Sequence, residues 1–307
     1  MTAPIRAETL SKWYGNVLGL SDVSLAIEPG ITGLLGPNGA GKSTFMKLIT
    51  GQLRPSLGVV TIDGRPVWNN TGFFSRFGFC PEQDAFYEDM TGWEFLFHLL
   101  RLYGGSRLDA AARAERALEF VELSEDRNRL IRGYSRGMRQ RLKFAQAVAH
   151  DPDVIVLDEP LNGLDPLGKR KVIKLIKDFR AQGKTIIVSS HVLPEIEALT
   201  RSIILIHQGK ILAQGDIHYI RDLIDAHPHV IAVRCDKPRD LAARLVGEDA
   251  VVDIRFGEGG AVVLETRNRD RLYGVLTRLA ADAGLDIEEI TSPDDNLQAV
   301  FDYLIGK

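Results

Sequence analysis

The sequence has few of the features that mark secreted or membrane-spanning proteins. Its 307 residues include only two cysteines, Cys80 and Cys235, too few for a disulfide framework. The longest stretch without Asp, Glu, Lys or Arg covers residues 29–41, which is 13 residues. A membrane-spanning helix needs about 20 mostly apolar residues, and a signal peptide needs an apolar core that the first residues do not show. We therefore expect a chain that stays in the reducing cytoplasm and does not cross a bilayer by itself.

No excess of positive charge is present either. The formal net charge is −3 and the sequence pI is about 6.2, which argues against nucleic acid as a partner. Two basic clusters, within residues 127–143 and 169–184, have two interpretations: a nucleic-acid stripe, or the solvated faces of two helices. Because aromatic residues are not interleaved with these charges, we favour solvated faces and expect no nucleic-acid partner.

Charge divides the chain into two parts. Residues 1–216 carry a net charge of +3, and residues 217–307 carry −6. The shift follows two turn signals, Gln208-Gly209-Lys210 and Gly215-Asp216. The sequence therefore predicts one domain over 1–216 and a second, accessory domain over 217–307.

The first domain has the pattern of an α/β fold. Short apolar runs at 30–35, 153–157 and 184–189 read as strands that are buried on both faces, and residues 42–50 read as a helix. This combination is typical of a parallel sheet covered on both sides. Between about residues 91 and 150 no strand pattern occurs, which predicts a helical subdomain inserted into the α/β domain.

The second domain has a different order of elements. Strand patterns at 230–233, 251–256, 260–265 and 287–291 alternate with helical patterns at 240–245 and 271–283, and a last helix is expected from Asn296. The order β-α-β-β-α-β is that of a ferredoxin-like domain. A generic small α+β appendage is as good an interpretation of this domain as any specific regulatory role.

A phosphate-binding loop follows the first apolar run. Residues 36–44 read GPNGAGKST and match the pattern G-x-x-x-x-G-K-[ST]. The glycines allow backbone N–H groups to converge on phosphates at the start of a helix. Lys42 is expected to reach the β- and γ-phosphates, and the Ser43 hydroxyl to bind Mg²⁺. The predicted nucleotide-binding residues are Gly36, Pro37, Asn38, Gly39, Ala40, Gly41, Lys42, Ser43 and Thr44.

Two acids follow the second apolar run. Asp158 and Glu159 stand directly after Val154–Leu157, where the second half of an ATP site is expected. An Asp at this place positions Mg²⁺, and a neighbouring carboxylate can polarise the attacking water. A helix cap would explain one acid but not a pair beside a phosphate loop.

Taken in order, the motifs resemble those of the nucleotide-binding subunit of an ABC transporter. Ser43 and Asp158 lie 115 residues apart, which leaves room for that family's helical insertion. The stretch YSRGMRQR at 134–141, 23 residues before Asp158 when counted from Ser135, is similar to the signature L-S-G-G-Q. The D-loop pattern follows at 163–166 and the switch-histidine pattern at 189–191. The resemblance covers about residues 1–216, and it implies a P-loop NTPase fold of the ABC ATPase type.

The resemblance also implies roles for single residues. Tyr14 resembles the aromatic residue that stacks on adenine, with Trp13 as the alternative; either could instead be a strand-end aromatic. Glu159 resembles the catalytic carboxylate and His191 the residue that contacts the γ-phosphate. Asp165 would organise the subunit interface. In the family, the serine and glycine that match Ser135 and Gly137 complete the ATP site of a second subunit.

The sequence departs from the family pattern at two places. Arg136 replaces the first glycine of the signature. The Q-loop position is Glu82, with glutamine displaced to Gln83, so either residue could face the metal. We expect both to lie at the nucleotide, and we expect Ser43, Asp158 and Glu82 to be the Mg²⁺ ligands. Cys80 has no partner at metal-ligand spacing and is expected to be a small packing residue.

These observations predict an ATPase, with ATP and Mg²⁺ as cofactors, that powers export across the cytoplasmic membrane. Since the chain lacks membrane helices, its partner would be a permease subunit on a separate chain, and it would be peripheral on the inner face of the membrane. A homodimer, or a heterodimer with another ATPase subunit, is expected. The tail resembles that of bacterial exporter ATPases, whereas sugar importers usually carry a different one. The alternatives are an importer ATPase and an ATP-gated, non-transport ABC ATPase of a membrane assembly.

Overall fold

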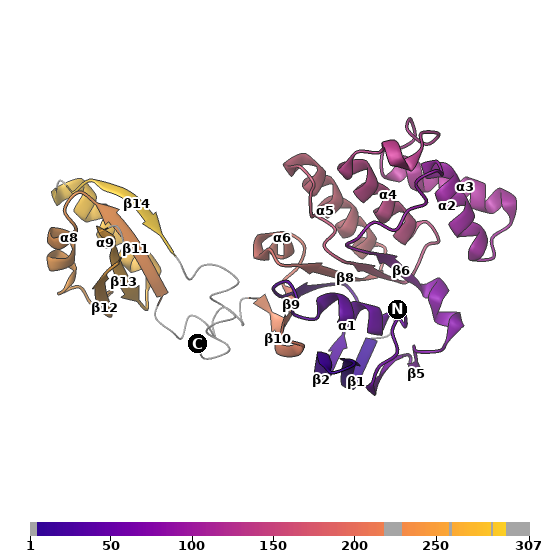
Figure 1. Cartoon of the computed structure of the whole chain (residues 1–307). Coiled ribbons are helices and arrows are strands. Elements are labelled where there is room, and N and C mark those ends of the chain that lie inside the picture. Colours follow the sequence, from indigo (N-terminus) through magenta and orange to yellow (C-terminus); the bar gives the residue numbers. More distant parts are fainter. Residues whose placement is uncertain (1–4, 218–228, 258–259, 284, 293–307) are drawn as a thin grey trace. The chain divides into compact units, whose positions relative to one another are not determined.

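A computed structural model describes residues 5–217, 229–257, 260–283 and 285–292 (Figure 1). The chain forms two compact units, Met1–Asp216 and Ile217–Lys307. Each unit has its own hydrophobic core. The last helix, expected from Asn296, falls outside the described residues.

A six-stranded sheet organises the first unit, with the strand order β10-β9-β3-β8-β7-β6. Neighbouring strands from β9 to β6 pair in parallel, and β10 pairs antiparallel with β9. Every residue of β3, β7 and β8 is buried, as expected from their continuous apolar runs. The strands are β3 Ile31–Leu35, β6 Phe77–Cys80, β7 Val154–Leu157, β8 Thr185–Ser190, β9 Ser202–His207 and β10 Lys210–Asp216.

A second, antiparallel sheet in this unit has the order β2-β1-β4-β5. This sheet was not predicted from the sequence. The burial pattern of β1 is irregular because its pairing with β2 shifts register at three places, so the chain lacks a clean period-two signal there. The strands are β1 Ile5–Tyr14, β2 Val17–Ile27, β4 Leu57–Ile62 and β5 Arg65–Pro66.

Helix α1, Lys42–Ile49, lies between the two sheets (Figure 1). Its Phe45, Met46 and Ile49 are fully buried and join one core with Ile5 of β1 and Leu34 of β3. The helix begins directly after the loop that follows β3. The core therefore fixes the start of α1 at the carboxyl edge of the parallel sheet.

The region 91–150 is helical in the structure, as predicted. Side chains cap three of the helices at their first turn: Thr91 caps α2, Ser106 caps α3 and Ser135 caps α4. Asp165 caps α5 in the same way. The helical elements are η1 Thr71–Arg76, α2 Gly92–Leu102, α3 Arg107–Phe120, η2 Ile131–Gly133, α4 Arg136–Val148, α5 Pro166–Ala181 and α6 Leu193–Glu197.

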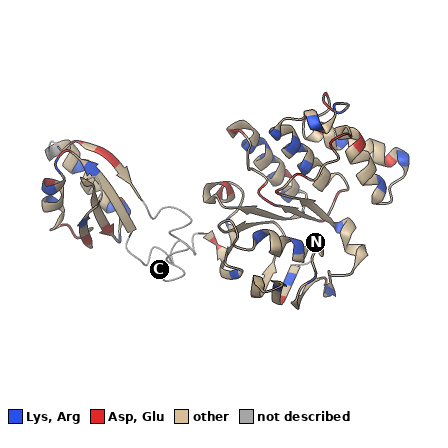
Figure 2. Ribbon diagram, viewed as in Figure 1, with Lys and Arg blue, Asp and Glu red and all other residues tan. Residues whose placement is uncertain are grey.

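Lys and Arg recur along α4 and α5 (Figure 2). On α5, Lys174 and Lys177 are exposed, as a solvated face requires. On α4, Lys143 is only 4% exposed and Arg139 is half-buried, and both contact residues 82–88. The interpretation as solvated faces therefore describes α5 better than α4.

The described residues of the second unit form a four-stranded antiparallel sheet with two helices, in the order β11-α8-β12-β13-α9-β14. The sheet order is β12-β13-β11-β14, the order of a ferredoxin-like β-α-β-β-α-β fold. Leu241, Leu264 and Leu276 are among its buried core residues. The elements are β11 His229–Cys235, α8 Pro238–Leu245, β12 Asp253–Phe256, β13 Val262–Thr266, α9 Arg269–Ala283 and β14 Ile287–Thr291.

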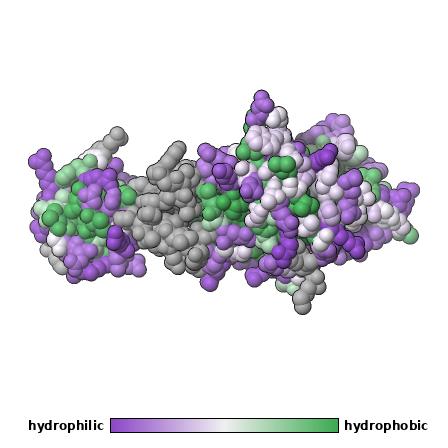
Figure 3. All heavy atoms as spheres, turned by 90° about the horizontal axis from the view of Figure 1, so that it is seen from below, coloured by the Kyte–Doolittle hydropathy of each residue, from purple (hydrophilic) through white to green (hydrophobic). Residues whose placement is uncertain are grey.

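In the face shown in Figure 3, hydrophobic and hydrophilic residues are interspersed over the first unit, and a hydrophobic group shows on the second. Among the described residues, no helix is both long and apolar enough to cross a membrane.

Candidate nucleotide site

The phosphate loop is a cradle with no room for a side chain at two of its glycines, Gly36 and Gly41. A Cβ built on Gly36 would stand 2.4 Å from the carbonyl oxygen of Ile206, so the close approach requires glycine. Gly41 has φ of +107° immediately before α1, a conformation that glycine adopts without strain. The first backbone N–H groups of α1 have no partners within the helix and are available to an anion.

Lys42 is buried at the base of this loop. Its Nζ donates to the carbonyl oxygens of Gly36, at 2.7 Å, and Pro37, at 3.3 Å. It also lies 3.3 Å from Oε1 of Glu159, and both side chains are less than a tenth exposed. Lys42 of the phosphate loop and Glu159, the second of the two acids after β7, therefore meet, although they are more than 100 positions apart in the sequence.

Asp158 and Glu159 follow β7 and are held by Ser189 of β8. Ser189 Oγ donates to Asp158 Oδ1 at 2.6 Å and accepts from the backbone N–H of Glu159 at 2.8 Å. Ser189 is fully buried, so one hydroxyl fixes both acids. Glu159 has φ of +48°, which is uncommon for a residue other than glycine and is strained backbone at the site.

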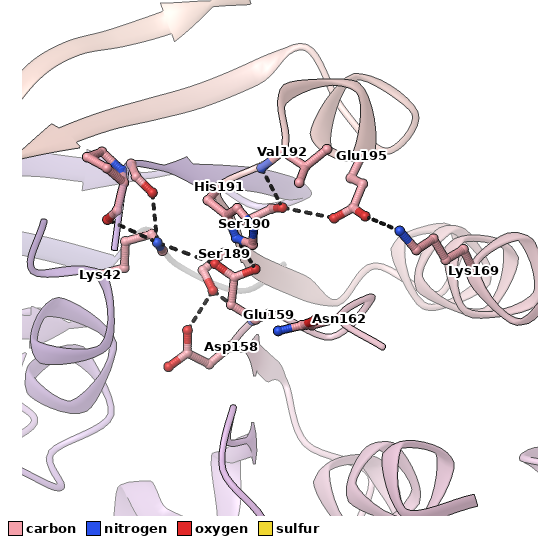
Figure 4. A network of polar contacts seen from close by, with 12 residues as sticks. Lys42, Asp158, Glu159, Asn162, Lys169, Ser189, Ser190, His191, Val192 and Glu195 are labelled. Atoms are coloured by element: carbon pink, nitrogen blue, oxygen red, sulfur yellow. Dashed lines mark hydrogen bonds and ion pairs between the residues drawn. The ribbon is translucent and has the colours of Figure 1, made fainter. Parts of the chain in front are cut away.

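His191 completes the group. Its Nδ1 lies 3.0 Å from Glu159 Oε2, so the glutamate stands between Lys42 on one oxygen and His191 on the other (Figure 4). His191 is partly exposed while the glutamate is buried. Glu159 is therefore shielded from bulk water and oriented at both carboxylate oxygens. This arrangement suits a general base that takes a proton from a positioned water.

The two candidate adenine-stacking residues lie at the end of β1. Tyr14 and Trp13 are each 46% exposed, and the Tyr14 hydroxyl lies 3.4 Å from Thr44 Oγ1 of the phosphate loop. Tyr14 is therefore both a strand-end aromatic and a neighbour of the loop. Its exposed ring leaves a face for a base, and stacking on adenine remains a prediction.

The Q-loop segment follows β6. Glu82 and Gln83 are both exposed, and the carbonyl oxygen of Glu82 accepts from Lys143 Nζ of α4 at 2.7 Å. Lys143 also pairs with Asp84 at 3.1 Å. Sequence reasoning missed Lys143; a lysine on a helix gave no sign that it would be buried against this loop. Which of Glu82 and Gln83 faces the metal stays a prediction.

Ser135 and Gly137 of the signature do not share a hydrogen bond with the phosphate loop. Ser135 Oγ accepts from the backbone N–H of Met138, and Asp165 Oδ1 accepts from that of Gly168. All three predicted interface residues, Ser135, Gly137 and Asp165, line a cavity of about 560 Å³ between α4 and α5, and Lys42 is not among its lining residues. The structure thus brings Lys42, Asp158, Glu159 and His191 together and places the signature elsewhere.

The structure also places Arg136, which departs from the family pattern, and Cys80, which was expected to be a packing residue. Arg136 lies against Gly163 and donates to Asn162 Oδ1 at 3.4 Å, so its guanidinium rests on the D-loop of its own chain. Cys80 is fully buried at the end of β6, and burial raises the pKa of its thiol to about 12. The buried position of Cys80 fits the packing role expected of it.

The residues present suit a nucleotide phosphate with Mg²⁺. The cradle around Gly36, the helix start and buried Lys42 provide for the phosphates. Among the described residues, no group of three or more His, Cys, Asp or Glu could hold a metal by itself. Mg²⁺ usually takes one or two protein ligands and completes its shell with phosphate oxygens and water.

Comparison with known proteins agrees with this geometry. The family model described as "ABC transporter" matches residues 20–162. The bacitracin transport ATP-binding protein BcrA of Enterococcus faecalis is 32% identical over 305 residues, covering 98% of this chain and 96% of that protein. The chain belongs to the ABC transporter ATP-binding family. The resemblance seen in the motifs and the predicted fold class are thus confirmed.

Other members match about 70% of the chain. An uncharacterised ABC transporter ATP-binding protein of Synechocystis is 38% identical over 229 residues, and the match spans 64% of that relative's length and 70% of this chain. The Nod factor export ATP-binding protein I of Burkholderia orbicola is 36% identical over 70% of this chain and 72% of that protein. The chain therefore spans slightly less than two thirds of the length of some of its relatives.

Solved structures of ABC cassettes share the fold. A dimeric ATP-binding cassette in a post-hydrolysis state, bound to ADP and phosphate, has a TM-score of 0.64 and 26% identity, covering 69% of this chain and 98% of that one. This chain therefore carries an ABC ATPase domain, the domain type that binds ATP and ADP and hydrolyses ATP in this family.

Proposed function

We propose that this chain is the ATP-hydrolysing subunit of an exporter: it hydrolyses Mg-ATP as part of a dimer and drives export through a permease on a separate chain, peripheral on the inner face of the cytoplasmic membrane. The observation that carries the hydrolysis is the buried Glu159, held between Lys42 and His191. Each further part of the proposal has its own support.

In this proposal Glu159 is the general base. Its Oε2 lies 3.0 Å from His191 Nδ1, so the imidazole orients the carboxylate, and Glu159 takes a proton from the attacking water. Lys42 leaves Glu159 Oε1 to bind the phosphates, because a γ-phosphate offers it more negative charge than one carboxylate. Ser43 and Asp158, with Glu82 or Gln83, would hold Mg²⁺, which would neutralise charge that develops on the phosphate oxygens.

A second chain would complete the site. Ser135 and Asp165 cap the starts of α4 and α5, and both line the cavity of about 560 Å³. Two helix N-termini at one cavity favour an anion there, yet the chain's own Lys42 is not part of it. A head-to-tail pair of chains would place the γ-phosphate held by one phosphate loop against the signature of the other, with two sites for each dimer.

An aromatic hollow supports docking to a membrane partner. Its volume is about 400 Å³, and its lining includes Phe74, Phe77, Phe79, Tyr87, Phe95 and Tyr103. Tyr87 is 67% exposed, and the neighbouring Leu102 is 83% exposed. A short amphipathic helix of a permease fits such a groove. Because Tyr87 and Ala85 belong to the segment that follows Glu82, a docked helix would touch the chain next to the nucleotide.

The direction of transport is proposed from two of the relatives. One is named for bacitracin transport and matches both units of this chain, and one is named for Nod factor export. The importer ATPase and the non-transport ATPase of a membrane assembly remain the alternatives, and the same experiment separates them.

The test is ATP hydrolysis and transport by the chain reconstituted with the membrane protein encoded beside its gene. We expect permease-stimulated hydrolysis and ATP-dependent loss of substrate from the side that holds the chain. Leu102→Asp should abolish the stimulation, since Leu102 lines an adjoining hollow that shares Phe74, Leu99 and Tyr103 with the groove. Leu108→Asp is the matched control, because Leu108 is equally exposed, at 84%, on α3 and lines neither hollow. Uptake toward the chain would favour an importer, and hydrolysis without any transport would favour the non-transport role.

A further inference from the structure

The turn that carries His191 is held on both sides by one hydroxyl group. Ser190 is 2% exposed at the end of β8. Its Oγ donates to Glu195 Oε2 at 2.9 Å and accepts from the backbone N–H of Val192 at 3.0 Å. Both bonds join Ser190, which precedes His191, to residues that follow it. They therefore fix the backbone from which the imidazole reaches Glu159 (Figure 4).

Glu195 links this turn to α5. Its second oxygen, Oε1, accepts from Lys169 Nζ at 2.7 Å. The glutamate side chain is only 13% exposed and the lysine side chain 38%. A short, charge-assisted bond to a largely buried carboxylate constrains geometry more than an exposed surface pair does. This link could not be predicted from the sequence, because Lys169 and Glu195 are 26 positions apart on two different helices.

Helix α6 is anchored without this chain of bonds. Its Ile196 is fully buried, and the side chain lies directly against Gly33 of β3. The hydrophobic contact holds the helix on the sheet, so neither Lys169 nor Glu195 is needed to keep α6 in place. What the polar chain adds is a fixed distance between the first turn of α5 and the turn at His191.

We propose that Lys169 and Glu195 are positioning residues: acting through Ser190, they set the turn that presents His191 to Glu159. The inference rests on the proposed function, because it assigns these residues to the hydrolytic reaction. Lys169 lies in the first turn of α5, the helix that Asp165 caps at the proposed subunit contact. A shift of that turn on dimer formation is thereby passed to His191.

The experiment measures steady-state hydrolysis of Mg-ATP by the full chain and by the variants Lys169→Met and Glu195→Gln. Methionine keeps the length of the lysine but cannot donate, and glutamine has one carbonyl oxygen where the carboxylate uses two. We expect kcat to fall about tenfold in each, the scale of a modest misplacement of a reacting group, with KM for ATP unchanged within about twofold. Lys177→Met, at an exposed position on the same helix, is the control and should match the unchanged protein.

The double variant decides whether the two residues act together. If they form one chain, Lys169→Met combined with Glu195→Gln should lose about tenfold, as each single variant does, instead of about a hundredfold. Additive losses, a kcat unchanged within about twofold, or a change in KM alone would overturn the inference. Measurements of nucleotide binding and thermal unfolding identify a misfolded variant. If Glu195→Gln misfolds, the kcat of Lys169→Met alone decides, because the Lys169 side chain is half-exposed. Absence of hydrolysis by the unchanged protein, with its permease present, would instead count against the proposed function.

Discussion

Replacing Glu159 by glutamine should stop turnover without emptying the site. Glutamine has the size and shape of glutamate, and the side chain is 5% exposed with Lys42 at 3.3 Å and His191 at 3.0 Å. The amide can fill the same space and still contact both neighbours. It cannot accept a proton from water, which is the step assigned to Glu159. The perturbation therefore removes one chemical property and little of the packing.

The magnitude follows from the role. A positioned general base contributes about 10²- to 10⁴-fold to a rate, which corresponds to about 3 to 5 kcal/mol of activation free energy. Nucleotide affinity should be unchanged or higher, because in the structure Lys42 is shared between Glu159 and two backbone carbonyls, and the neutral amide competes less for the ammonium group. Turnover and affinity are thus expected to move in different directions.

The assay compares phosphate release with equilibrium binding of Mg-ATP for the unchanged protein, Glu159→Gln and Glu119→Gln. The last is the control, since Glu119 is exposed on α3. Phosphate release by Glu159→Gln within a few-fold of the unchanged protein would refute the assignment of the base. Loss of both release and binding would mean that the carboxylate holds the site together and that its catalytic role is unproven.

Three further outcomes are expected. A protein shortened to residues 1–216 should still bind Mg-ATP, since every contact of the site lies in the first unit; a folded but non-binding product would contradict the domain division. Burial lowers the pKa of His150, so its neutral ring favours the folded state above the ordinary pKa of about 6.5, and this contribution is lost as the pH falls below it. The melting temperature should then fall less steeply on acidification in His150→Asn than in the unchanged protein. Equal slopes for the two proteins would show that His150 does not contribute to the pH dependence of stability. Cys80, with its pKa near 12, should resist alkylation at pH 8 until the protein unfolds. Rapid labelling of the native chain would show that the segment at the end of β6 opens.

The parts of the site that the sequence revealed are those built from contiguous residues. The phosphate loop requires glycines and a lysine at fixed spacing, and the two acids directly follow an apolar strand, so both are visible in a single chain segment. Three of the parallel strands, β3, β7 and β8, were equally clear because they are buried on both faces, whereas β6 and β9 were not predicted. In each case the physical requirement acts on neighbours in the sequence.

The remaining parts depend on residues that only the fold brings together. Ser189 and Ser190 look alike at the end of β8, yet the first holds the acids after β7 and the second holds Glu195 of α6, because successive side chains of a strand point to opposite faces. Burial of Lys143 against Glu82 likewise depends on how α4 packs. The antiparallel sheet was missed because register shifts interrupt the alternation in β1.

A site shared between two chains is the claim on which the account of turnover depends, and a mixing experiment tests it most directly. Lys42→Ala weakens phosphate binding, and Ser135→Arg places bulk and positive charge beside Arg136, so each variant alone should be inactive. A heterodimer of the two has one site with an intact Lys42 from one chain and an intact Ser135 from the other. The account predicts ATP hydrolysis by the mixture above that of either parent. The account would be contradicted by no recovery in a mixture shown to contain heterodimers, together with a crosslink within one chain in a separate variant that carries cysteines near Gly39 and near Ser135.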